Sequence, residues 1–494
     1  MKKLYITSPI YYVNDKPHLG TAYTTILADT LARYYRWQGK DVFFLTGTDE
    51  HGLKIQQRAQ NLNKNPQDFC DEISKDFQYV WQALNISYDK FIRTTDLEHK
   101  KAVQDGLMRL YKKGLIYKGE YKGLYCVGCE QYKTKSDLIE GKCPYHNREP
   151  ELKKEKTWLF KLSYFKDKIL NLIQKNYFLI EPETRKNEII SFLKKEGLED
   201  LSISRPKEKV WWGIELPFDK SETTYVWIDA FFNYLTGLGW PENKNQFQHY
   251  WPPDIQLMSK DILRFHATIW PSLLIGLEEK LPRRICIHGF LSIDGQKMSK
   301  SLGNVVDPVE IVKKYGADTL RFFLLKNISF GKDGDFTIEK LEKCYNNDLA
   351  NDLGNLVQRV VVMINKYLKG KIPNFKVKNI NQITLKDVQE MTIFNSREIK
   401  KLDQLINNCN FDQALSLIWE KVRLTNQSIE NSKPWVLVKK NPQQLEKVLY
   451  NLVADILGIA CFLLPFIPQT SKTIIEIYQG PKVKFKDSLF PKIK

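Results

Sequence analysis

The stretch KLYITSPIYYVNDKPHLGT, residues 3–21, joins a short apolar run to a polar loop that turns into a helix. A second apolar run, DVFFLTGT at residues 41–48, also ends in small polar residues, as buried parallel strands typically do. Between the runs Gly39 is placed to end a helix whose apolar side chains repeat at helical spacing. That stripe consists of Leu27, Leu31, Tyr34 and Tyr35. Strand, helix and strand in this order predict a right-handed βαβ unit and an α/β fold with a doubly wound parallel sheet.

The overall composition indicates a folded, multidomain protein with a basic surface. The 494 residues are 43% hydrophobic and 12% aromatic, so we expect packed cores in about two to four domains. The net charge of +17 favours a polyanion such as nucleic acid, although a lysine-rich proteome would supply part of it without any ligand. The N-terminus shows no secretory signal, and the longest apolar run, residues 456–467, is too short to span a bilayer. We therefore expect a cytoplasmic protein that does not bind membranes.

The chain divides into segments of different pattern. Further strand-like runs, DIQLMS at 254–259 and RRICIHGF at 283–290, continue the α/β half, and long helical stretches dominate from Asn346 onward. A cysteine-containing segment interrupts the α/β half. We therefore expect an α/β part in two halves (1–116 and 206–290), a connective insertion between them (117–205), a linking region (291–345) and a helical domain (346–494).

Three of the eight cysteines cluster in the interrupting segment, which indicates a metal site in a reducing compartment rather than a disulfide framework. Cys126 and Cys129 form a C-x-x-C pair, and Cys143 and His146 form a C-x-x-H pair. Four such ligands in two close pairs suit tetrahedral Zn²⁺ and leave no open position, so the predicted role is structural. Two unrelated pairs would be the alternative, and this spacing makes that alternative less probable.

Two further motifs carry candidate chemistry. His18 stands at the loop-to-helix corner, where a lone His-x-Gly is more often a surface loop residue. The loop DGQKMSKSLGNVVDP, residues 294–308, places Lys297 and Lys300 around a serine, and two mobile ammonium groups suit the binding of a triphosphate. Taken alone, a charged surface loop is an equal reading of that segment.

Together these motifs resemble the two signatures of class I aminoacyl-tRNA synthetases, namely PHLGT (17–21) and KMSKS (297–301). Other segments sharpen the resemblance to methionyl-tRNA synthetases of the bacterial type over nearly the whole chain; they are YITSPIYYVNDKPHLG, FFLTGTDEHG, YVWIDAFFNY, KDILRFHATIWP and KMSKSLGNVVDP. The resemblance implies a Rossmann-like fold with an inserted zinc-knuckle module and a C-terminal helical anticodon-binding domain. The chain departs from the family pattern at Thr21, usually a second histidine, and at Ser259, usually a glycine.

The resemblance also implies an ATP site. His18 would donate a hydrogen bond to the α-phosphate at the N-terminus of a helix, and Lys297 and Lys300 would act on the leaving phosphates of ATP, which binds with Mg²⁺. Gly20 would let the backbone approach the adenosine closely. The implied ATP-binding set is Gly20, Thr21, Ser259, Asp261, Lys297, Met298, Ser299, Lys300 and Ser301.

The implied methionine pocket is aromatic, which suits a soft thioether. Asp49 would hold the substrate ammonium, with Arg205 as the charge partner of that carboxylate. The remaining implied residues are Ile10, Tyr12, Trp227, Ala230, Tyr234, His266 and Trp270. Without the resemblance, these aromatic residues would be read as ordinary core.

The helical domain would read the anticodon through Asn355 and Arg359, which are four residues apart on one helix face, and through Trp435. Without the resemblance, the first two would be a solvated helix face and Trp435 a hydrophobic anchor. The expected activity is ligation of L-methionine to initiator and elongator tRNA(Met) by a monomer. Two rival hypotheses are a small-substrate nucleotidyltransferase and a non-catalytic RNA-binding chaperone that kept the fold.

Overall fold

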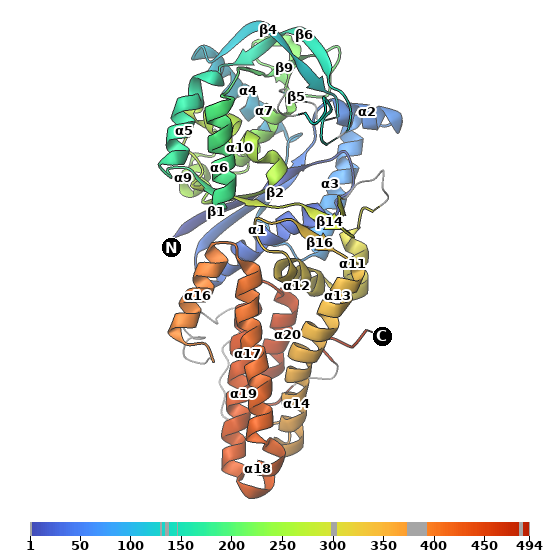
Figure 1. Cartoon of the computed structure of the whole chain (residues 1–494), viewed down its shortest axis with the longest axis vertical. Coiled ribbons are helices and arrows are strands. Elements are labelled where there is room, and N and C mark those ends of the chain that lie inside the picture. Colours follow the sequence, from blue (N-terminus) through green and yellow to red (C-terminus); the bar gives the residue numbers. More distant parts are fainter. Residues whose placement is uncertain are drawn as a thin grey trace.

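The computed structural model describes residues 2–128, 131–133, 138–145, 147–297, 304–372, 393–483 and 488–493. Figure 1 shows an elongated molecule with an α/β part at one end and a bundle of long helices at the other. The antiparallel strands β4 (Ile116–Cys126) and β6 (Glu151–Phe160) lie at the α/β extreme, and the short helix α18 (Pro434–Lys440) lies at the helical extreme.

The N-terminal segment folds as its pattern predicts. Strand β1 (Lys3–Tyr12), helix α1 (Leu19–Trp37) and strand β2 (Asp41–Asp49) form the expected unit, and β1 pairs with β2 in parallel. All four residues of the predicted helical stripe are buried. The turn after α1 contains Gly39 at φ +75°, a left-handed conformation that costs glycine little.

The central sheet has six strands in the order β3-β2-β1-β12-β13-β7, and all of its pairs are parallel. The strands not yet given are β3 (Lys90–Arg93), β7 (Leu179–Glu181), β12 (Ile255–Ser259) and β13 (Arg284–His288). The strand order reverses between β1 and β12, which makes this gap the topological switch point of the sheet. Strand β7 comes from inside the range 117–205, so the predicted insertion is not separate from the parallel sheet.

Both faces of the sheet are covered, and the side chains of β1 alternate between two cores. Leu4 and Ile6 pack in one core with α1 and the helical part, whereas Tyr5 packs in the other.

The remaining helices of the α/β part are α2 (Leu53–Asn61), α3 (Pro66–Ala83), α4 (Leu97–Lys112), α5 (Lys166–Gln174), α6 (Glu183–Lys195), α7 (Val226–Phe231), α8 (Asn233–Thr236), α9 (Lys244–Tyr250) and α10 (Leu263–Leu277).

Three smaller sheets complete the α/β part. Their orders are β5-β4-β6-β8, β10-β11-β9 and β15-β14-β16. The strands involved are β5 (Gln131–Lys133), β8 (Leu201–Ser202), β9 (Ser204–Pro206), β10 (Glu215–Leu216), β11 (Asp219–Thr224), β14 (Leu291–Ile293), β15 (Gln296–Lys297) and β16 (Gly334–Phe336).

The C-terminal part is helical, as predicted from residue 346 onward. Three helices lead into it, namely α11 (Pro308–Tyr315), α12 (Ala317–Asn327) and α13 (Ile338–Cys344). Its other elements are a π-helical segment (Tyr345–Gly354), α14 (Asn355–Leu368), α16 (Ser396–Asn407), α17 (Phe411–Ser432), α19 (Pro442–Leu463) and α20 (Pro468–Tyr478). No helix among the described residues is both long and apolar enough to cross a membrane.

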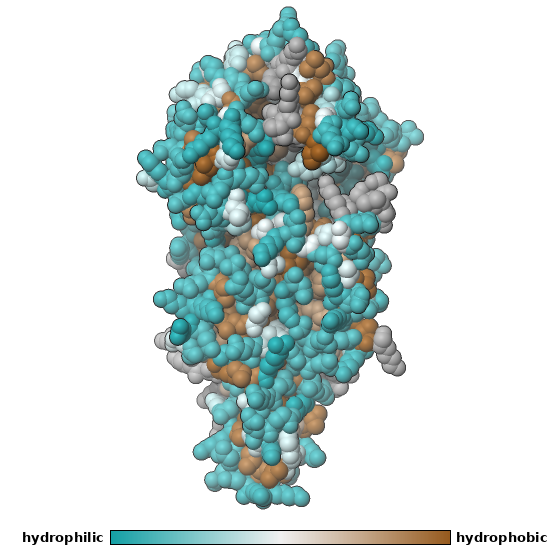
Figure 2. All heavy atoms as spheres, viewed as in Figure 1, coloured by the Kyte–Doolittle hydropathy of each residue, from teal (hydrophilic) through white to brown (hydrophobic). Residues whose placement is uncertain are grey.

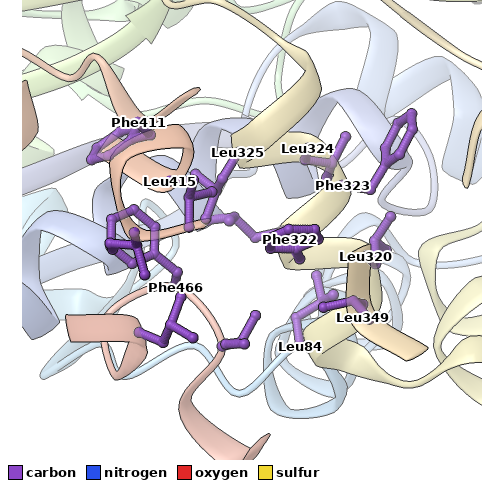
Figure 3. Close-up of a cluster of buried hydrophobic side chains, with 14 of the residues drawn as sticks. Leu84, Leu320, Phe322, Phe323, Leu324, Leu325, Leu349, Phe411, Leu415 and Phe466 are labelled. Carbon is purple, nitrogen blue, oxygen red and sulfur yellow. The ribbon is translucent and has the colours of Figure 1, made fainter. Parts of the chain in front are cut away.

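A continuous apolar core joins the two ends of the molecule. Figure 3 shows the side chains of α12 between Leu84 of the α/β part and Phe411, Leu415 and Phe466 of the helical part. By contrast, the face of the molecule in Figure 2 is mostly hydrophilic, with small and scattered hydrophobic patches.

A buried ion pair crosses the same boundary. Arg321 of α12 contacts Asp29 of α1 at 2.7 Å, and both side chains are 0% exposed. The guanidinium also donates to the carbonyl oxygens of Pro465 and Phe466, between α19 and α20. A buried charge of this kind is tolerated because every side of it is paired or hydrogen-bonded.

Candidate active site

A cleft of about 530 Å³ opens at the switch point between β1 and β12, where ligands bind in doubly wound sheets. Its walls come from the segments that follow β1, β12 and β13 and from helix α7. The predicted site residues that line it are Ile10, Tyr12, His18, Gly20, Thr21, Asp49, Trp227, Ala230, Tyr234, Ser259, Asp261 and His266. The structure thus brings together most of the described residues predicted for ATP and methionine.

His18 caps the N-terminus of α1 with its side chain. Its Nδ1 accepts a hydrogen bond from the backbone N–H of Gly20 at 3.1 Å. Burial lowers the pKa of His18, which favours the neutral ring. A neutral imidazole whose Nδ1 is an acceptor carries its proton on Nε2. His18 therefore has an Nε2–H donor at the positive end of a helix dipole, which is the arrangement that attracts a phosphate.

The Thr21 hydroxyl takes part in the cap of α1 and does not offer the cleft a second hydrogen-bond donor. Its hydroxyl donates to the carbonyl of His18 at 2.7 Å and accepts from the backbone N–H of His18 at 3.1 Å. The bond from the His18 N–H to Thr21 and the acceptance of a first-turn backbone N–H by the His18 side chain together form a capping box, so the residue that replaces the family's second histidine stabilises the start of α1.

Ser259 fits its position without strain. It precedes the short 3₁₀ turn Lys260–Ile262 and has φ −80° and ψ 157°, values that any residue adopts. The next residue, Lys260, binds Asp333 at 2.7 Å and lies over the ring of Phe290, so its ammonium faces this pair.

The aromatic half of the cleft is held by ring stacking and by a neutral histidine. Trp227 stacks on Phe265 with ring centroids 4.3 Å apart. His266 contacts the carbonyl oxygen of Ile262 through Nδ1 at 3.0 Å and the hydroxyl of Tyr234 through Nε2 at 2.8 Å. Since a carbonyl only accepts, Nδ1 carries the proton and Nε2 accepts from the tyrosine. Burial lowers the pKa of His266 to about 4, so this wall is uncharged at neutral pH.

Two residues predicted for the methionine pocket lie behind the cleft walls or away from them. Trp270 is fully buried, stacks on Phe231 and donates from Nε1 to Gln256 at 3.2 Å, so it supports the pocket from the second layer. Arg205 donates to Ser202 and to the carbonyl of Ser204, and its guanidinium lies 4.5 Å from the centroid of the Tyr225 ring. Neither residue is among the residues that form the described cleft surface.

Sequence reasoning missed several polar residues of the cleft. His288 is the last residue of β13. Its Nδ1 donates to the carbonyl of Gly289, and its Nε2 contacts the Thr24 hydroxyl at 2.8 Å. Burial lowers the pKa of His288 to about 4. Lys54, from the first turn of α2, brings a cation to the same cleft. The signal for His288 was its position at the end of a parallel strand, where such side chains converge on a ligand site.

Part of the predicted site lies outside the described residues. These residues are Met298, Ser299, Lys300, Ser301, Cys129 and His146. The backbone of Lys297 ends β15, which pairs with β14 through Ser292. Because β14 begins at Leu291, a cleft residue, the chain enters the KMSKS segment from a hairpin next to the cleft.

The predicted anticodon residues lie on the helical part. Asn355 is exposed at the start of α14, and Arg359, one turn further on, forms an ion pair with Glu430 of α17. Trp435 is 43% exposed in α18, which follows α17 directly and forms the tip in Figure 1. This region lies at the opposite end of the molecule from β4 and β6.

The family of the chain follows from comparison with known proteins. The family model described as tRNA synthetases class I (M) matches residues 4–150 and 135–361, more than half of the chain. With a nucleotide-sized cleft at the switch point, the fold and the site are those of a class I tRNA synthetase.

Individual relatives narrow this class. The methionine–tRNA ligase of Caldanaerobacter subterraneus is 43% identical across 100% of this chain and 79% of its own length. That of Clostridium acetobutylicum is 45% identical across 96% of this chain and 73% of its own length. The solved Mycobacterium tuberculosis methionyl-tRNA synthetase in complex with methionyl-adenylate matches with a TM-score of 0.90 and 36% identity, covering 99% of this chain and 100% of that one. The chain belongs to the methionine–tRNA ligase family.

Proposed function

We propose that the cleft at the β1–β12 switch point is where this chain, acting as a methionine–tRNA ligase, joins L-methionine to tRNA(Met) at the expense of ATP. The observation that carries the assignment is His18, a neutral imidazole with its Nε2–H free of the helix cap, at the N-terminus of α1 and in the wall of the cleft. The aromatic wall around Trp227, Tyr234 and His266 lies in the same cleft.

In the first step the methionine carboxylate oxygen attacks the α-phosphorus of ATP. A new O–P bond forms, the bond to the bridging oxygen breaks, and pyrophosphate leaves. The Nε2–H of His18 and the amide groups at the start of α1 stabilise the charge that develops on the α-phosphate oxygens. We assign Lys297 and Lys300 to the leaving phosphates, and Mg²⁺ enters with ATP as its counter-ion.

The methionine side chain occupies the aromatic half of the cleft. Sulfur–aromatic contacts contribute about 0.3–1.5 kcal/mol each, so several rings favour the thioether over a branched aliphatic chain. Asp49, at the end of β2, supplies the carboxylate for the substrate ammonium. A neutral His266 keeps this pocket from repelling that ammonium.

In the second step the 3′-terminal adenosine hydroxyl of the tRNA attacks the carbonyl carbon of methionyl-adenylate and releases AMP. We assign residues 346–494 to anticodon binding through Asn355, Arg359 and Trp435, because an exposed indole with nearby amide and guanidinium groups can stack on and read unpaired bases. The net charge of +17 supports binding of tRNA by the monomer that we propose.

We further propose that Cys126, Cys129, Cys143 and His146 hold one structural Zn²⁺ in the connective module. Cys126 ends β4, the carbonyl of Cys143 accepts from the Asn147 N–H in a turn, and both cysteines are at most 3% exposed. Two buried thiols near a short hairpin fit a closed zinc site, whose bound ion would hold the hairpin and the turn together. Metal analysis should find one zinc per chain, and the Cys126→Ser variant should lose it; equal zinc in both proteins would refute the proposal.

The reaction is tested by methionine-dependent exchange of pyrophosphate into ATP. We expect methionine to support exchange far better than cysteine or leucine does. Absence of exchange with any amino acid would favour the non-catalytic RNA-binding alternative. Exchange driven best by another amino acid would refute the pocket assignment.

A further inference from the structure

A fully buried polar cluster lies directly behind the methionine half of the cleft. Both carboxylate oxygens of Asp229 are engaged by imidazoles, one by His51 Nδ1 at 2.6 Å and the other by His99 Nε2 at 2.8 Å. The second nitrogen of His99, Nδ1, contacts the hydroxyl of Thr236 at 2.8 Å. The side chains of the three titratable residues are at most 3% exposed.

The cluster ties together four segments that are far apart in the sequence. His51 stands two residues after Asp49, in the segment that follows β2, and Asp229 belongs to α7. His99 comes from the first turn of α4, and Thr236 ends α8. Asp229 therefore links the segment carrying Asp49 to the helix that carries the pocket aromatics.

Helix α7 presents Asp229 on the side away from the cleft. Trp227, Ala230 and Phe231 of this helix line the cleft, whereas Asp229 does not. At about 100° per residue, Asp229 lies nearly opposite the mean direction of those three residues. The carboxylate thus fixes the back of the helix whose front forms the methionine wall.

The two hydrogen bonds compensate for a costly burial. Burial by itself would raise the pKa of Asp229, but the two histidines lower it to about 2, so the group is a carboxylate at neutral pH. An ionised carboxylate in an apolar core is retained only where donors satisfy it, and charge-assisted bonds of this length restrict geometry strongly. Such a linkage holds the two walls of a pocket within a fraction of an ångström.

We propose that Asp229, through His51 and His99, is a positioning residue that sets the distance between the ammonium site at Asp49 and the aromatic wall of α7, and so determines methionine affinity. The inference rests on the proposed function and extends it, because it assigns a role to three residues that do not touch the substrate. The ATP half of the cleft is built on α1 and on the segments after β12 and β13, whereas the hydrogen bonds of the cluster join α4, α7, α8 and the segment after β2, so ATP binding should be spared.

The test compares the effect of one substitution on the KM for methionine with its effect on the KM for ATP. In Asp229→Asn the side-chain volume is kept, but an N–H group replaces one acceptor oxygen. Since a misplacement of about 1 Å in a site can cost up to about a hundredfold, we expect the methionine KM in pyrophosphate exchange to rise about tenfold or more. The KM for ATP should stay within about twofold of wild type. Titration of methionine against intrinsic tryptophan fluorescence should show the same loss without relying on turnover.

Matched variants at His51 keep the test decisive even where Asp229→Asn fails to fold. His51→Asn retains an N–H donor near the position of Nδ1, whereas His51→Leu has a similar size and no donor. We expect His51→Asn to keep the methionine KM within about threefold and His51→Leu to raise it about tenfold or more, as misplacement of the pocket wall would. Asp318→Asn, which alters a buried carboxylate of α12 bonded to the Thr470 N–H, is the control for stability loss alone and should change neither KM.

Three results would overturn the inference. They are an unchanged methionine KM in Asp229→Asn, an equal rise of both KM values, and identical behaviour of the two His51 variants. Failure of the proposed function is seen separately, because the wild-type enzyme would then show no methionine-dependent exchange and no methionine binding.

Discussion

The two nitrogens of His18 have separate tasks, and one substitution can separate them. Nδ1 accepts from the Gly20 N–H and caps α1, while Nε2 carries the proton that we assign to the α-phosphate of ATP. In His18→Asn, the side-chain oxygen can take the place of Nδ1, since asparagine is among the best N-cap residues. Nothing in asparagine reaches the position of Nε2. His18→Asn should therefore keep the helix and lose the phosphate donor.

The expected magnitudes follow from these two contacts. Removing one donor to developing charge in a preorganised site costs about 2.7–4 kcal/mol, which corresponds to a loss of about 10²–10³ in kcat. Loss of an N-cap costs about 0.5–2 kcal/mol of stability, and this should be seen in His18→Ala but not in His18→Asn. The methionine KM should stay within about twofold in both, because the donor is assigned to the phosphate and not to the amino acid.

Pyrophosphate exchange measures the first effect, and urea unfolding followed by circular dichroism measures the second. We expect His18→Asn and His18→Ala to be similarly slow but to differ in unfolding midpoint. An asparagine variant that keeps more than about a tenth of the wild-type kcat would refute the role of the Nε2 proton, since one oxyanion donor is worth more than that. Equal destabilisation by both substitutions would refute the cap.

Three further predictions concern other parts of the molecule. Lys300→Ala should reduce the rate of adenylate formation by about a hundredfold or more while leaving methionine binding within about twofold, because its ammonium is assigned to the leaving phosphates; a loss of methionine affinity in fluorescence titration would contradict this. Trp435→Ala should leave pyrophosphate exchange intact and weaken tRNA charging, by about 1–3 kcal/mol of base stacking; equal losses in both assays would exclude the tip of the helical part as the tRNA contact. The folded pKa values of His266 and His288, about 4, lie below the ordinary value, so the unfolded chain takes up protons first and stability falls as the pH decreases from about 6.5 toward 4. Urea unfolding at about pH 7 and about pH 5 should show this loss, at most about 1.4 kcal/mol per histidine per pH unit, and His288→Asn should reduce it; an unchanged pH dependence in that variant would refute the assignment.

The parallel sheet could be predicted because its main strands are continuous apolar runs. The predicted strands near residues 3, 41, 254 and 283 are confirmed as β1, β2, β12 and β13. Strand β7 has only three residues, too few for any period to be recognised, and its place at the sheet edge depends on pairing with β13 more than a hundred residues later. Short strands of this kind are specified by tertiary packing rather than by local pattern.

Some residues of the candidate site could likewise be predicted from the sequence, and others could not. Motif residues such as His18 and Ser259 were predicted from the resemblance to the family, and the structure places His18 at the start of α1 and Ser259 at the end of β12. A motif cannot distinguish the wall of a pocket from the layer behind it, so Trp270 was assigned to the wall although it supports the pocket from the core. The cluster around Asp229 could not be predicted, because its partners are 130 and 178 residues away in sequence and share no period.

Helix α1 contacts both the cleft of the α/β part and the helical part of the molecule. Its first turn faces the cleft, its middle holds Asp29 against Arg321, and its last turns donate from the hydroxyls of Tyr34 and Tyr35 to α16. Removing the helical end would deprive Arg321 of the carbonyl oxygens of Pro465 and Phe466 and would expose the apolar side of α12. An excised catalytic fragment would then need a rebuilt surface to stay in solution, and on heating the intact chain both ends should melt in one cooperative transition.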